Sequence, residues 1–429
     1  MKGGAHHDVV VIGAGPAGLG AALALGDTAV VLEHGPDAGG LCATVALGGA
    51  VFDLGGHSFH TPHPTIRELV FGAVAMEEQA REAWCVVGGE WIPYPFQKNF
   101  GKLRDRTIVR ECREGLERRS TVAPRNLDEH LEGRYGAGIT RHFLRPYNEK
   151  LWGPDLTRLT TEWTAQRMAA STDAPEAFST EGGVRTPLQS DTRVAYPARG
   201  GYGEIFRSLA KRVPRIRFGA SVASIDTRLR SLATARGERL HWKRIVSTLP
   251  LPVLLDLLPD VPAPLRGAVR RLVALPVTLV LIALESRLET PIQRIYFPGN
   301  EFPGHKVVVN HNSSASLRAL PNHGVLVEVS AGGGRASNAE LLCKEVIAGL
   351  RSVRLLRDRD KVAATRVIEL SRAYPVPTHE RAAIVDDART WLAERGISSV
   401  GRFGEWAYIN ADEALYRGLR LGEKLVRQA

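Results

Sequence analysis

Three glycines near the start of the chain have the spacing of a phosphate-binding turn. Gly13, Gly15 and Gly18 form the pattern GxGxxG: the first glycine permits a tight turn, the second lets the backbone approach a pyrophosphate, and the third allows a helix to pack closely on a strand. The phosphates of a dinucleotide then lie at the N-terminus of that helix, where unpaired N–H groups favour anions. Glu33 follows Gly13 by 20 residues, the spacing of a carboxylate that binds ribose hydroxyls. These residues predict a dinucleotide site.

The segments around these glycines are of the kinds that such a site needs. Residues 8–12 form an apolar run typical of a buried strand, and residues 17–25 are rich in Ala and Leu and predict a helix. Residues 29–32 predict a second strand that ends at Glu33. A strand, a turn, a helix and a second strand open a doubly wound fold. The sequence therefore predicts a Rossmann-like α/β domain.

Four further segments favour FAD over NAD as the dinucleotide. A Gly-Gly pair follows Glu33, and FDLGGH then occupies residues 52–57, which resembles the extended FAD signature of glutathione-reductase and amine-oxidase type flavoproteins. FGASVASID at residues 218–226 is similar to the strand whose backbone meets adenine in that superfamily, and VSTLP at residues 246–250 is similar to the segment that follows it. Besides the three glycines and Glu33, the expected cofactor-binding residues are Gly39, Gly40, Gly56, Val222, Asn410 and Asp412.

The rest of the chain predicts two more structural parts. Residues 103–170 are charged, poor in β-branched runs and helical in pattern, whereas residues 272–329 contain β-rich segments punctuated by Gly, Pro and Asn, which favours an antiparallel sheet. Strand signals for the first domain recur near residues 245–248 and at the C-terminus, so that domain is expected to be discontinuous. The expected division is residues 1–85, 197–262 and 380–429 for the FAD-binding domain, 98–180 for the helical domain, and 86–97, 181–196 and 263–379 for the sheet domain.

The composition of the 429-residue chain narrows the class of protein. Hydrophobic residues make up 44% and charged residues 24%, which is ordinary for a globular protein, and the formal net charge is +10. This charge is compatible with an anionic small substrate or a diffusely basic surface. No run of five or six Lys or Arg occurs and no nucleic-acid-binding signature is present, so no nucleic-acid partner is expected.

The sequence also gives expectations about cellular location, membrane insertion and metal binding. Four cysteines without a CxxC pair, and a start that runs directly into a strand, favour a reduced cytoplasmic location without a signal peptide. The longest apolar run, residues 272–284, is too short to span a bilayer, so no membrane insertion is expected. No His, Cys and Asp cluster has the spacing of metal ligands, so no metal is expected.

Segments along most of the chain resemble the UDP-galactopyranose mutase family. They are HSFHT from His57, WIPYPFQ at residues 91–97 followed by Asn99, RPYNEKLW at residues 145–152, Trp163 with Arg167, PARGGYG at residues 197–203, YPVPT at residues 374–378 and GRFGEWAY at residues 401–408. The WIPYPFQ and RPYNEKLW segments are similar to the eukaryotic branch of the family.

This resemblance implies roles for particular residues. It places Tyr94, Phe96 and Trp152 around a uracil ring, for which an aromatic surface contributes about 1–3 kcal/mol of stacking. Gln97 and Asn148 are expected to bind the polar edges of the nucleotide. Another group is expected to bind the diphosphate or to close over the substrate: Arg402, Tyr374, Tyr408 and Arg167. His57 is expected beside the isoalloxazine, and His60 and His63 carry a weaker signal.

One departure from the family pattern bears on the substrate. The eukaryotic mutases carry an arginine on a sheet strand, in a motif like PxYRAT, where this chain reads PGHKVV from Pro303 to Val308. Lys306, or His305, therefore stands where the family has arginine, and lysine supplies charge without the planar fork. Either Lys306 meets the phosphates as a point charge, or the enzyme takes a different nucleotide or sugar.

The function implied is that of an isomerase, an intramolecular transferase. In the family, reduced FAD acts as a nucleophile through N5 at the anomeric carbon and interconverts pyranose and furanose forms, which is covalent catalysis by the cofactor. Arg402, Lys306, His57, Tyr374 and Tyr408 are the expected catalytic residues. The expected partners are a nucleotide-diphosphate sugar and a reductant such as NAD(P)H or a flavin reductase system; a homo-oligomer stays an option.

The expected substrate pair is UDP-galactopyranose and UDP-galactofuranose. Three alternatives to this expected function stay open. The first keeps the chemistry but uses a GDP- or dTDP-linked hexose, as in a specialised glycoside or antibiotic pathway, and it is motivated by Lys306. The second is an FAD-dependent oxidase or desaturase of the amine-oxidase superfamily, which has no need of the YPFQ and RPYN segments. The third is a protein that binds FAD or a nucleotide without catalysis.

Overall fold

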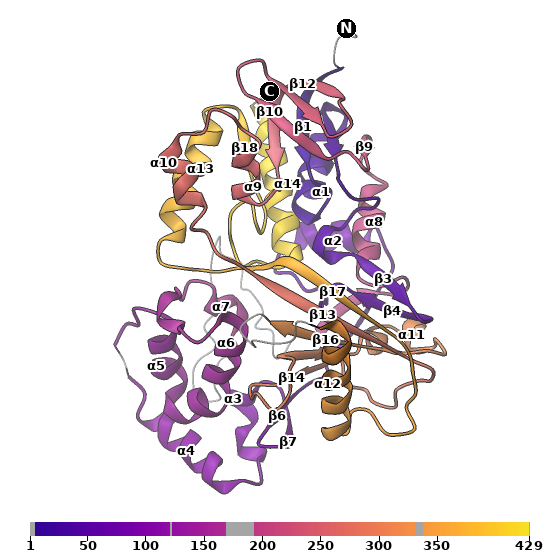
Figure 1. Cartoon of the computed structure of the whole chain (residues 1–429), viewed down its shortest axis with the longest axis vertical. Coiled ribbons are helices and arrows are strands. Elements are labelled where there is room, and N and C mark those ends of the chain that lie inside the picture. Colours follow the sequence, from indigo (N-terminus) through magenta and orange to yellow (C-terminus); the bar gives the residue numbers. More distant parts are fainter. Residues whose placement is uncertain (1–4, 121, 169–192, 331–337, 429) are drawn as a thin grey trace.

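The structure, a computed structural model, describes residues 5–120, 122–168, 193–330 and 338–428. These residues form three parts, which are arranged in Figure 1 with the dinucleotide-type domain and both ends of the chain at the top, a group of helices at the lower left, and a second large sheet across the middle and lower right. The expected fold class is confirmed: a Rossmann-like domain, a helical part and a largely antiparallel sheet.

The first sheet combines segments from three distant stretches of the chain. Its strand order is β10-β11-β12-β1-β2-β9, and β18 also pairs with β12. The strands β1, β2, β9, β12 and β18 run parallel, whereas β10 and β11 are antiparallel additions. Their bounds are β1 Ala5–Ile12, β2 Ala29–Leu32, β9 Ile216–Arg217, β10 Val222–Asp226, β11 Ser231–Thr234, β12 Arg239–Ser247 and β18 Ile397–Ser399.

This sheet is buried on both faces, as parallel sheets are. Alternate side chains of a strand point to opposite faces, so Val9 and Val11 of β1 enter one hydrophobic cluster and Val10 and Ile12 enter another. The helices that belong to this part are α1 Pro16–Leu25, α2 Pro64–Phe71, α8 Gly203–Ala210, α9 Leu251–Asp256, α10 Ala263–Val269, α13 Arg381–Ala393 and α14 Ala411–Arg427. The apolar run at residues 8–12, read as a buried strand, is therefore part of the central strand.

The C-terminal helix α14 is attached to the first helix through glycines. A Cβ atom on Gly418 would lie 1.9 Å from the carbonyl oxygen of Ala17, and one on Gly20 would lie 2.2 Å from the carbonyl oxygen of Leu415. Backbones can approach so closely only where no side chain stands between them. The last residues of the chain therefore complete the first domain, which is discontinuous (Figure 1).

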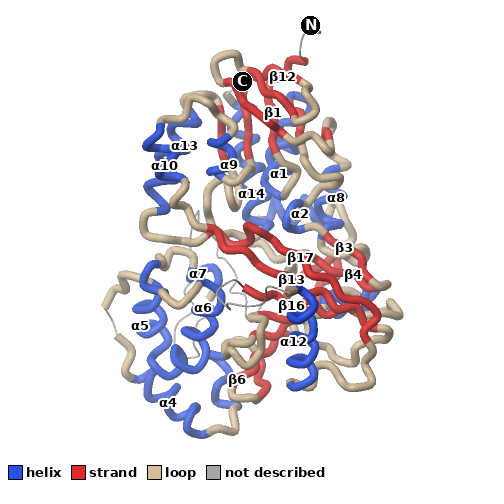
Figure 2. The backbone as a smooth tube through the Cα atoms, in the orientation of Figure 1, coloured by secondary structure: helices blue, strands red, loops and turns tan. Residues whose placement is uncertain are grey.

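The second sheet has the strand order β17-β13-β16-β15-β14-β6-β7. All its neighbouring strands are antiparallel except β14 and β6, which are parallel. The bounds are β6 Ala83–Val87, β7 Glu90–Pro93, β13 Ala274–Leu284, β14 Arg294–Tyr296, β15 Lys306–Val308, β16 Gly324–Ser330 and β17 Val362–Pro375. Figure 2 shows β13, β16 and β17 crossing the middle of the molecule, with α12, Ala339–Ser352, against this sheet.

The register of this sheet aligns polar side chains on one face. Tyr296 of β14 pairs with Lys306 of β15, and Lys306 pairs with Glu328 of β16, so the three side chains form one row across three strands. Arg294 lies two residues before Tyr296 and therefore points to the same face. The opposite face of β13 and β16 packs on α12 through apolar residues such as Val327.

The helical part packs around its own hydrophobic core. Its helices are α3 Phe96–Asn99, α4 Arg106–Glu117, α5 Leu127–Ile139, α6 Arg145–Trp152 and α7 Thr164–Arg167, with a π-helical turn at Thr140–Leu144. Asp105 caps α4 by accepting from the N–H of Thr107 at 2.9 Å, and Asn126 caps α5 by accepting from the N–H of Glu129 at 3.0 Å. The described part of the expected helical domain ends at residue 168; the remainder, to residue 180, lies outside the described residues.

Two short pairs of strands link the parts, and they differ from the expected domain boundaries. Strand β8, Arg193–Pro197, was expected with the second sheet but pairs with β5, Met76–Ala80, in a separate ribbon. Strand β6 begins at Ala83 and belongs to the second sheet, although the expected boundary was residue 85. The other pair is β3 Thr44–Leu47 with β4 Ala50–Asp53. Among the helices of the described ranges, none has the length and hydropathy that a membrane span requires.

The contact between α1 and α14 yields a stability prediction. We expect Gly418→Ala to lower the free energy of unfolding by about 1–3 kcal/mol, because its methyl group has to displace the backbone of Ala17. The matched control is Gly267→Ala in α10, where no atom lies within 4 Å of the new Cβ and a gain of up to about 1 kcal/mol is expected. Urea unfolding followed by circular dichroism measures both. Equal stability of the two variants would contradict the close contact.

Candidate active site

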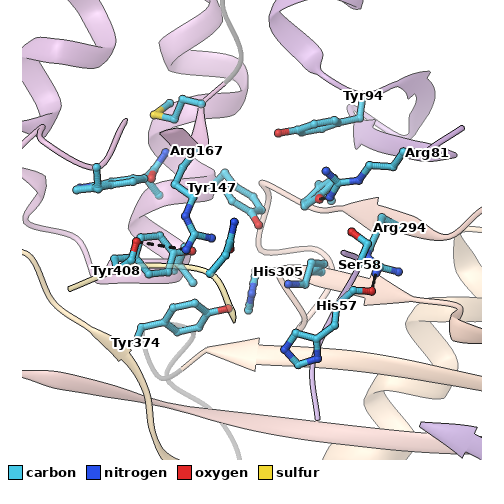
Figure 3. Close-up of a pocket in the computed structure, with 18 of the residues that line it drawn as sticks. His57, Ser58, Arg81, Tyr94, Tyr147, Arg167, Arg294, His305, Tyr374 and Tyr408 are labelled. Carbon is cyan, nitrogen blue, oxygen red and sulfur yellow. Dashed lines mark hydrogen bonds between the residues drawn. The ribbon is translucent and has the colours of Figure 1, made fainter. Parts of the chain in front are cut away.

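Two adjoining cavities lie where the three parts of the structure meet. One, of about 380 Å³, extends from the glycine-rich turn to the second sheet; the other, of about 180 Å³, lies between the second sheet and the helical part. Eight residues line both: Gly56, His57, Arg167, Lys306, Tyr374, Tyr408, Asn410 and Ala411. We refer to the first as the dinucleotide cavity, to the second as the substrate cavity, and to the eight residues as the junction. Figure 3 shows the side chains around the substrate cavity.

The glycine-rich turn has the geometry that its spacing predicts. Gly13 has a positive φ of 100°, and a Cβ atom on Gly18 would lie 1.9 Å from the carbonyl oxygen of Gly13. A Cβ atom on Gly15 would meet nothing within 4 Å, so the space in front of this residue is open toward the dinucleotide cavity that it lines. No side chain caps the N-terminus of α1, which leaves its first N–H groups to an anion.

The acid at the end of β2 is tied to this turn. Glu33 is buried, lines the dinucleotide cavity, and accepts from the N–H of Ala14 at 2.7 Å and of Gly35 at 2.7 Å. Gly40 lies against Gly15, since its Cβ atom would be 3.6 Å from the Cα of Gly15. An open pyrophosphate position, a buried ribose acid and an apolar wall that includes Val277 and Leu279 together suit FAD.

The remaining expected cofactor residues differ in their position. Gly56 and Asn410 lie at the junction, and Asn410 precedes the first turn of α14. Gly39, with a positive φ of 118°, supports the Gly-Gly turn but does not line the cavity. Val222 packs against the hydrophobic core from β10, and Asp412 is buried and hydrogen-bonded to Thr61, so neither reaches the cavity surface. Burial raises the pKa of Asp412 to about 6.

A buried carboxylate organises the floor of the junction. Glu328, 2% exposed, accepts from the N–H of Gly56 at 2.7 Å, lies 2.8 Å from Nζ of Lys306 and 3.4 Å from Nε2 of His305, and accepts from the hydroxyl of Tyr374 at 3.3 Å. Burial alone would raise the pKa of this carboxyl, but Lys306 and His305 outweigh burial and hold it well below its usual range. Glu328 is therefore a carboxylate that orients Lys306 toward both cavities.

Two arginines and two tyrosines converge at the other side of the junction. The guanidinium of Arg167 lies 4.0 Å from the ring centre of Tyr408, and that of Arg402 lies 5.0 Å from Tyr408 and 5.4 Å from Tyr374. Arg402 donates from Nε and Nη2 to the carbonyl oxygen of Ala373, at 3.1 and 2.8 Å, and from Nη1 to that of Ile409. Burial lowers the pKa of Arg402, which nevertheless stays a cation. This cluster, which we call the cationic cluster, suits a diphosphate.

Three of the expected nucleotide-binding residues line the substrate cavity and two do not. Tyr94, Gln97 and Asn148 form part of its wall. Phe96 is fully buried and stacks on Phe143, with ring centres 5.1 Å apart, so it belongs to the core of the helical part. Trp152 is also buried and contacts the rings of Tyr374 and Tyr408 from behind. Phe96 and Trp152 therefore support the cavity wall from behind and do not face the cavity, where a base would stack.

The histidines fall into two groups. His57 lies at the junction, stacks on Tyr202 with ring centres 4.9 Å apart, and is neutral at pH 7 because burial lowers its pKa to about 3. His60 lines the substrate cavity, and burial lowers its pKa to about 4. His63 lies elsewhere, 2.8 Å from Glu413 and stacked on Tyr416. Within the described ranges, no group of three or more His, Cys, Asp or Glu gathers as a metal site.

Several cavity residues escaped the reading of the sequence: Ser58, Arg81, Tyr147, Arg294, Tyr296 and Glu328. A signal existed for Glu328, because it is the one charged residue within the apolar segment VLVEV, and a charge in a buried strand is costly unless it is paired and hydrogen-bonded. Arg294 and Tyr296 stand in the segment RIYF, whose alternation placed them on one face. For Arg81 we find no local signal.

Comparisons with known proteins agree with this geometry. A family model described as flavin-containing amine oxidoreductase matches residues 100–364, and one described as NAD(P)-binding Rossmann-like domain matches residues 11–71. A crystal structure of reduced UDP-galactopyranose mutase superposes with a TM-score of 0.87 at 25% identity, covering 99% of this chain and 94% of that one.

Two further solved structures share the fold. A protein from Exiguobacterium sp. 255-15, provisionally assigned as a protoporphyrinogen oxidase, has a TM-score of 0.73 at 16% identity over 100% of both chains. Wild-type putrescine oxidase bound to putrescine has a TM-score of 0.67 at 17% identity, covering 99% of this chain and 100% of that one. The architecture is thus shared by proteins of different named activities.

The network around Glu328 can be tested by stability. We expect Glu328→Gln to lower the free energy of unfolding by about 3–5 kcal/mol, because Lys306, whose side chain is 15% exposed, would lose its counter-charge. The double variant Glu328→Gln/Lys306→Met should recover more than half of that loss, since the unpaired cation is then gone. Urea unfolding of the flavin-loaded proteins measures both values. A single-variant cost below about 1 kcal/mol would contradict the assigned pairing.

Proposed function

The chain belongs to the family of flavin-containing amine oxidoreductases and its cofactor is FAD, and from this premise we propose that it is a nucleotide-sugar mutase. The proposed reaction interconverts the pyranose and furanose forms of a hexose linked to a nucleoside diphosphate. UDP-galactopyranose and UDP-galactofuranose are the proposed pair, and the likeness to UDP-galactopyranose mutase supports it. The galactose-specific part of the proposal rests on that likeness and on the resemblance of the sequence.

The observation that carries the proposal is the cationic cluster at the junction. Arg167, Arg402, Tyr374 and Tyr408 converge where the dinucleotide cavity meets the substrate cavity. A diphosphate needs cations and hydroxyl donors, and both are present within a few ångströms of one another. A diphosphate bound at this cluster would lie where the two cavities meet, so the sugar attached to it would lie next to the dinucleotide cavity.

The substrate cavity offers a place for the nucleoside. Tyr94, Tyr147 and Tyr296 supply aromatic surface, with the rings of Tyr94 and Tyr296 4.5 Å apart. Gln97 and Asn148 add amides to the same wall. Base stacking on such surfaces contributes about 1–3 kcal/mol. This arrangement favours a nucleotide over a small uncharged substrate.

The proposed chemistry divides between the cofactor and the chain. Reduced FAD, when bound, supplies an electron pair at N5 for covalent catalysis at the anomeric carbon. The chain's own groups bind and orient: Arg402 and Arg167 stabilise the negative charge of the departing diphosphate, and Lys306 adds a point charge whose direction is set by Glu328. His57 is uncharged at pH 7. Its backbone carbonyl accepts a hydrogen bond from Arg294, and the residue lines both cavities at the junction.

An amine oxidase is the second candidate, favoured by the family and by the fold shared with putrescine oxidase. The charge of the cavity opposes it. Arg81, Arg167, Arg294 and Lys306 line the substrate cavity, and among its described lining residues none is acidic. Glu328 offsets the charge of Lys306, but the three guanidinium groups would repel an amine that is protonated at pH 7 and attract a nucleotide sugar.

The two candidates make opposite predictions about electrons. We expect the dithionite-reduced protein, incubated without oxygen with UDP-galactofuranose, to form UDP-galactopyranose without net consumption of reductant, and the oxidised protein to form none. Separation of the two nucleotide sugars by chromatography measures the conversion. Oxygen consumption in proportion to an added amine, with no interconversion of the sugars, would identify an oxidase and sink the proposal.

The cationic cluster can be tested by substitution. We expect Arg402→Ala to lower kcat by about a hundredfold or more while the flavin stays bound, because it removes charge stabilisation of the leaving diphosphate. The control is Arg359→Ala, an exposed arginine paired with Glu289 on another face, which should keep full turnover. Flavin absorbance after gel filtration checks cofactor content. Normal turnover of Arg402→Ala would refute this role.

A further inference from the structure

Arg294 is a buried cation whose hydrogen bonds in the described structure go to the backbone. It is 3% exposed, lies on β14 and lines the substrate cavity. Nη1 donates to the carbonyl oxygen of Gln293 at 3.0 Å, and Nη2 donates to the carbonyl oxygen of His57. A guanidinium has five N–H donors, so these two bonds do not exhaust it.

The described part of the chain offers Arg294 no carboxylate at ion-pair distance. The nearby acid that acts on it is Asp53, which already accepts from the hydroxyl of Tyr196 at 2.6 Å, from that of Thr44 at 2.7 Å and from the N–H of Tyr202 at 2.9 Å. Burial lowers the pKa of Arg294, and the charge of Arg81 acts in the same direction. A buried cation without a counter-charge is costly, which is a reason to expect an anion in the working complex.

Arg294 lies beside the junction and away from the cationic cluster. A Cβ atom built on Gly56 would lie 3.2 Å from Nε of Arg294 and 3.1 Å from Cε of Lys306, and Gly56 lines both cavities. In Figure 3, Arg294 lies with Ser58 and His57 on one side of the pocket, and Arg167, Tyr408 and Tyr374 lie on the other. A diphosphate held by the cationic cluster therefore does not neutralise Arg294.

We propose that the sugar of the substrate carries a carboxylate, as in a hexuronic acid, and that Arg294 binds this group. The inference rests on the proposed mutase reaction, but it departs from the proposed galactose pair, because galactose carries a neutral hydroxymethyl group where a hexuronic acid carries the carboxylate. The planar fork of a guanidinium matches a carboxylate in two parallel hydrogen bonds, which a neutral hydroxymethyl group at the same carbon cannot reproduce. The position beside Gly56 and His57 places this contact next to the sugar rather than next to the base.

The test compares ligands that differ only in the carboxylate. UDP, GDP and dTDP are first compared as ligands of the flavin-loaded, dithionite-reduced protein by calorimetry. The preferred base then selects the pair: UDP-galactose and UDP-galacturonate, GDP-mannose and GDP-mannuronate, or dTDP-glucose and dTDP-glucuronate. We expect the hexuronate to bind about tenfold more tightly than the hexose, or better.

Variants separate recognition from support of the fold. Arg294→Gln should abolish the preference for the hexuronate while leaving affinity for the free diphosphate within about threefold, and Arg294→Lys should retain part of the preference because it keeps the charge. Arg359→Gln, at the exposed site, should leave the preference intact. If Arg294 merely supports the loop at His57, Arg294→Gln weakens both ligands equally, and the inference is overturned.

The outcomes also distinguish this inference from the proposed function. If none of the three diphosphates binds, the nucleotide-sugar function itself fails and the inference falls with it. If a diphosphate binds but hexose and hexuronate bind equally well to the wild-type protein, the inference alone fails, and the mutase proposal stands on its own assay.

Discussion

A carboxylate buried in the middle of a strand needs partners, and this need shapes the site. Glu328 satisfies it with Lys306 from the neighbouring strand β15, His305 directly before that strand, Tyr374 from β17 and the N–H of Gly56 from the first domain. Because these partners come from separate parts of the chain, one charge joins the second sheet to the glycine-containing loop of the dinucleotide domain. The direction of Lys306, and with it the departure from the family's arginine, depends on this contact.

The distribution of charge and aromatic surface follows from the same sheet. Tyr296, Lys306 and Glu328 form one row across three strands, and Arg294 lies on the same face, so the sheet presents alternating polar groups to the cavities. The helical part supplies the opposite wall, where Trp152 contacts the rings of Tyr374 and Tyr408 edge-on from behind. Trp163, which lines the substrate cavity, contacts the ring of Tyr408 edge-on. A buried aromatic support keeps these side chains in one orientation, which is what preorganised binding of a diphosphate requires.

The dinucleotide cavity depends on contacts between the two ends of the chain. The helix α14 packs on α1 through Gly20 and Gly418, and Asn410, which precedes α14, lines the junction. The same pair of helices thus brings the glycine-rich turn and the segment of Arg402 to Asn410 into one cavity. The close approach of the α1 and α14 backbones therefore both stabilises the fold and assembles the site.

The sequence by itself determined what depends on neighbours along the chain. The turn at Gly13, the helix after it and the acid at Glu33 follow from spacing alone. The resemblance of the ordered motifs to a known family pointed to Arg167, Tyr374, Arg402 and Tyr408, which the fold brings together. The antiparallel character of most of the second sheet also followed from its β-rich segments. Periodicity and turn chemistry are local properties, so a single sequence carries them.

Only the tertiary structure decided which side chains of a motif face a cavity. Phe96 and Tyr94 stand two residues apart, yet Phe96 stacks on Phe143 in the core while Tyr94 lines the wall. The positions of Glu328 and Arg294 in the site depend on strands that pair across long separations in the sequence. Strand β6, for example, pairs in parallel with β14, which lies more than two hundred residues later. Cross-strand register and burial arise from packing between distant segments, and no local pattern encodes them.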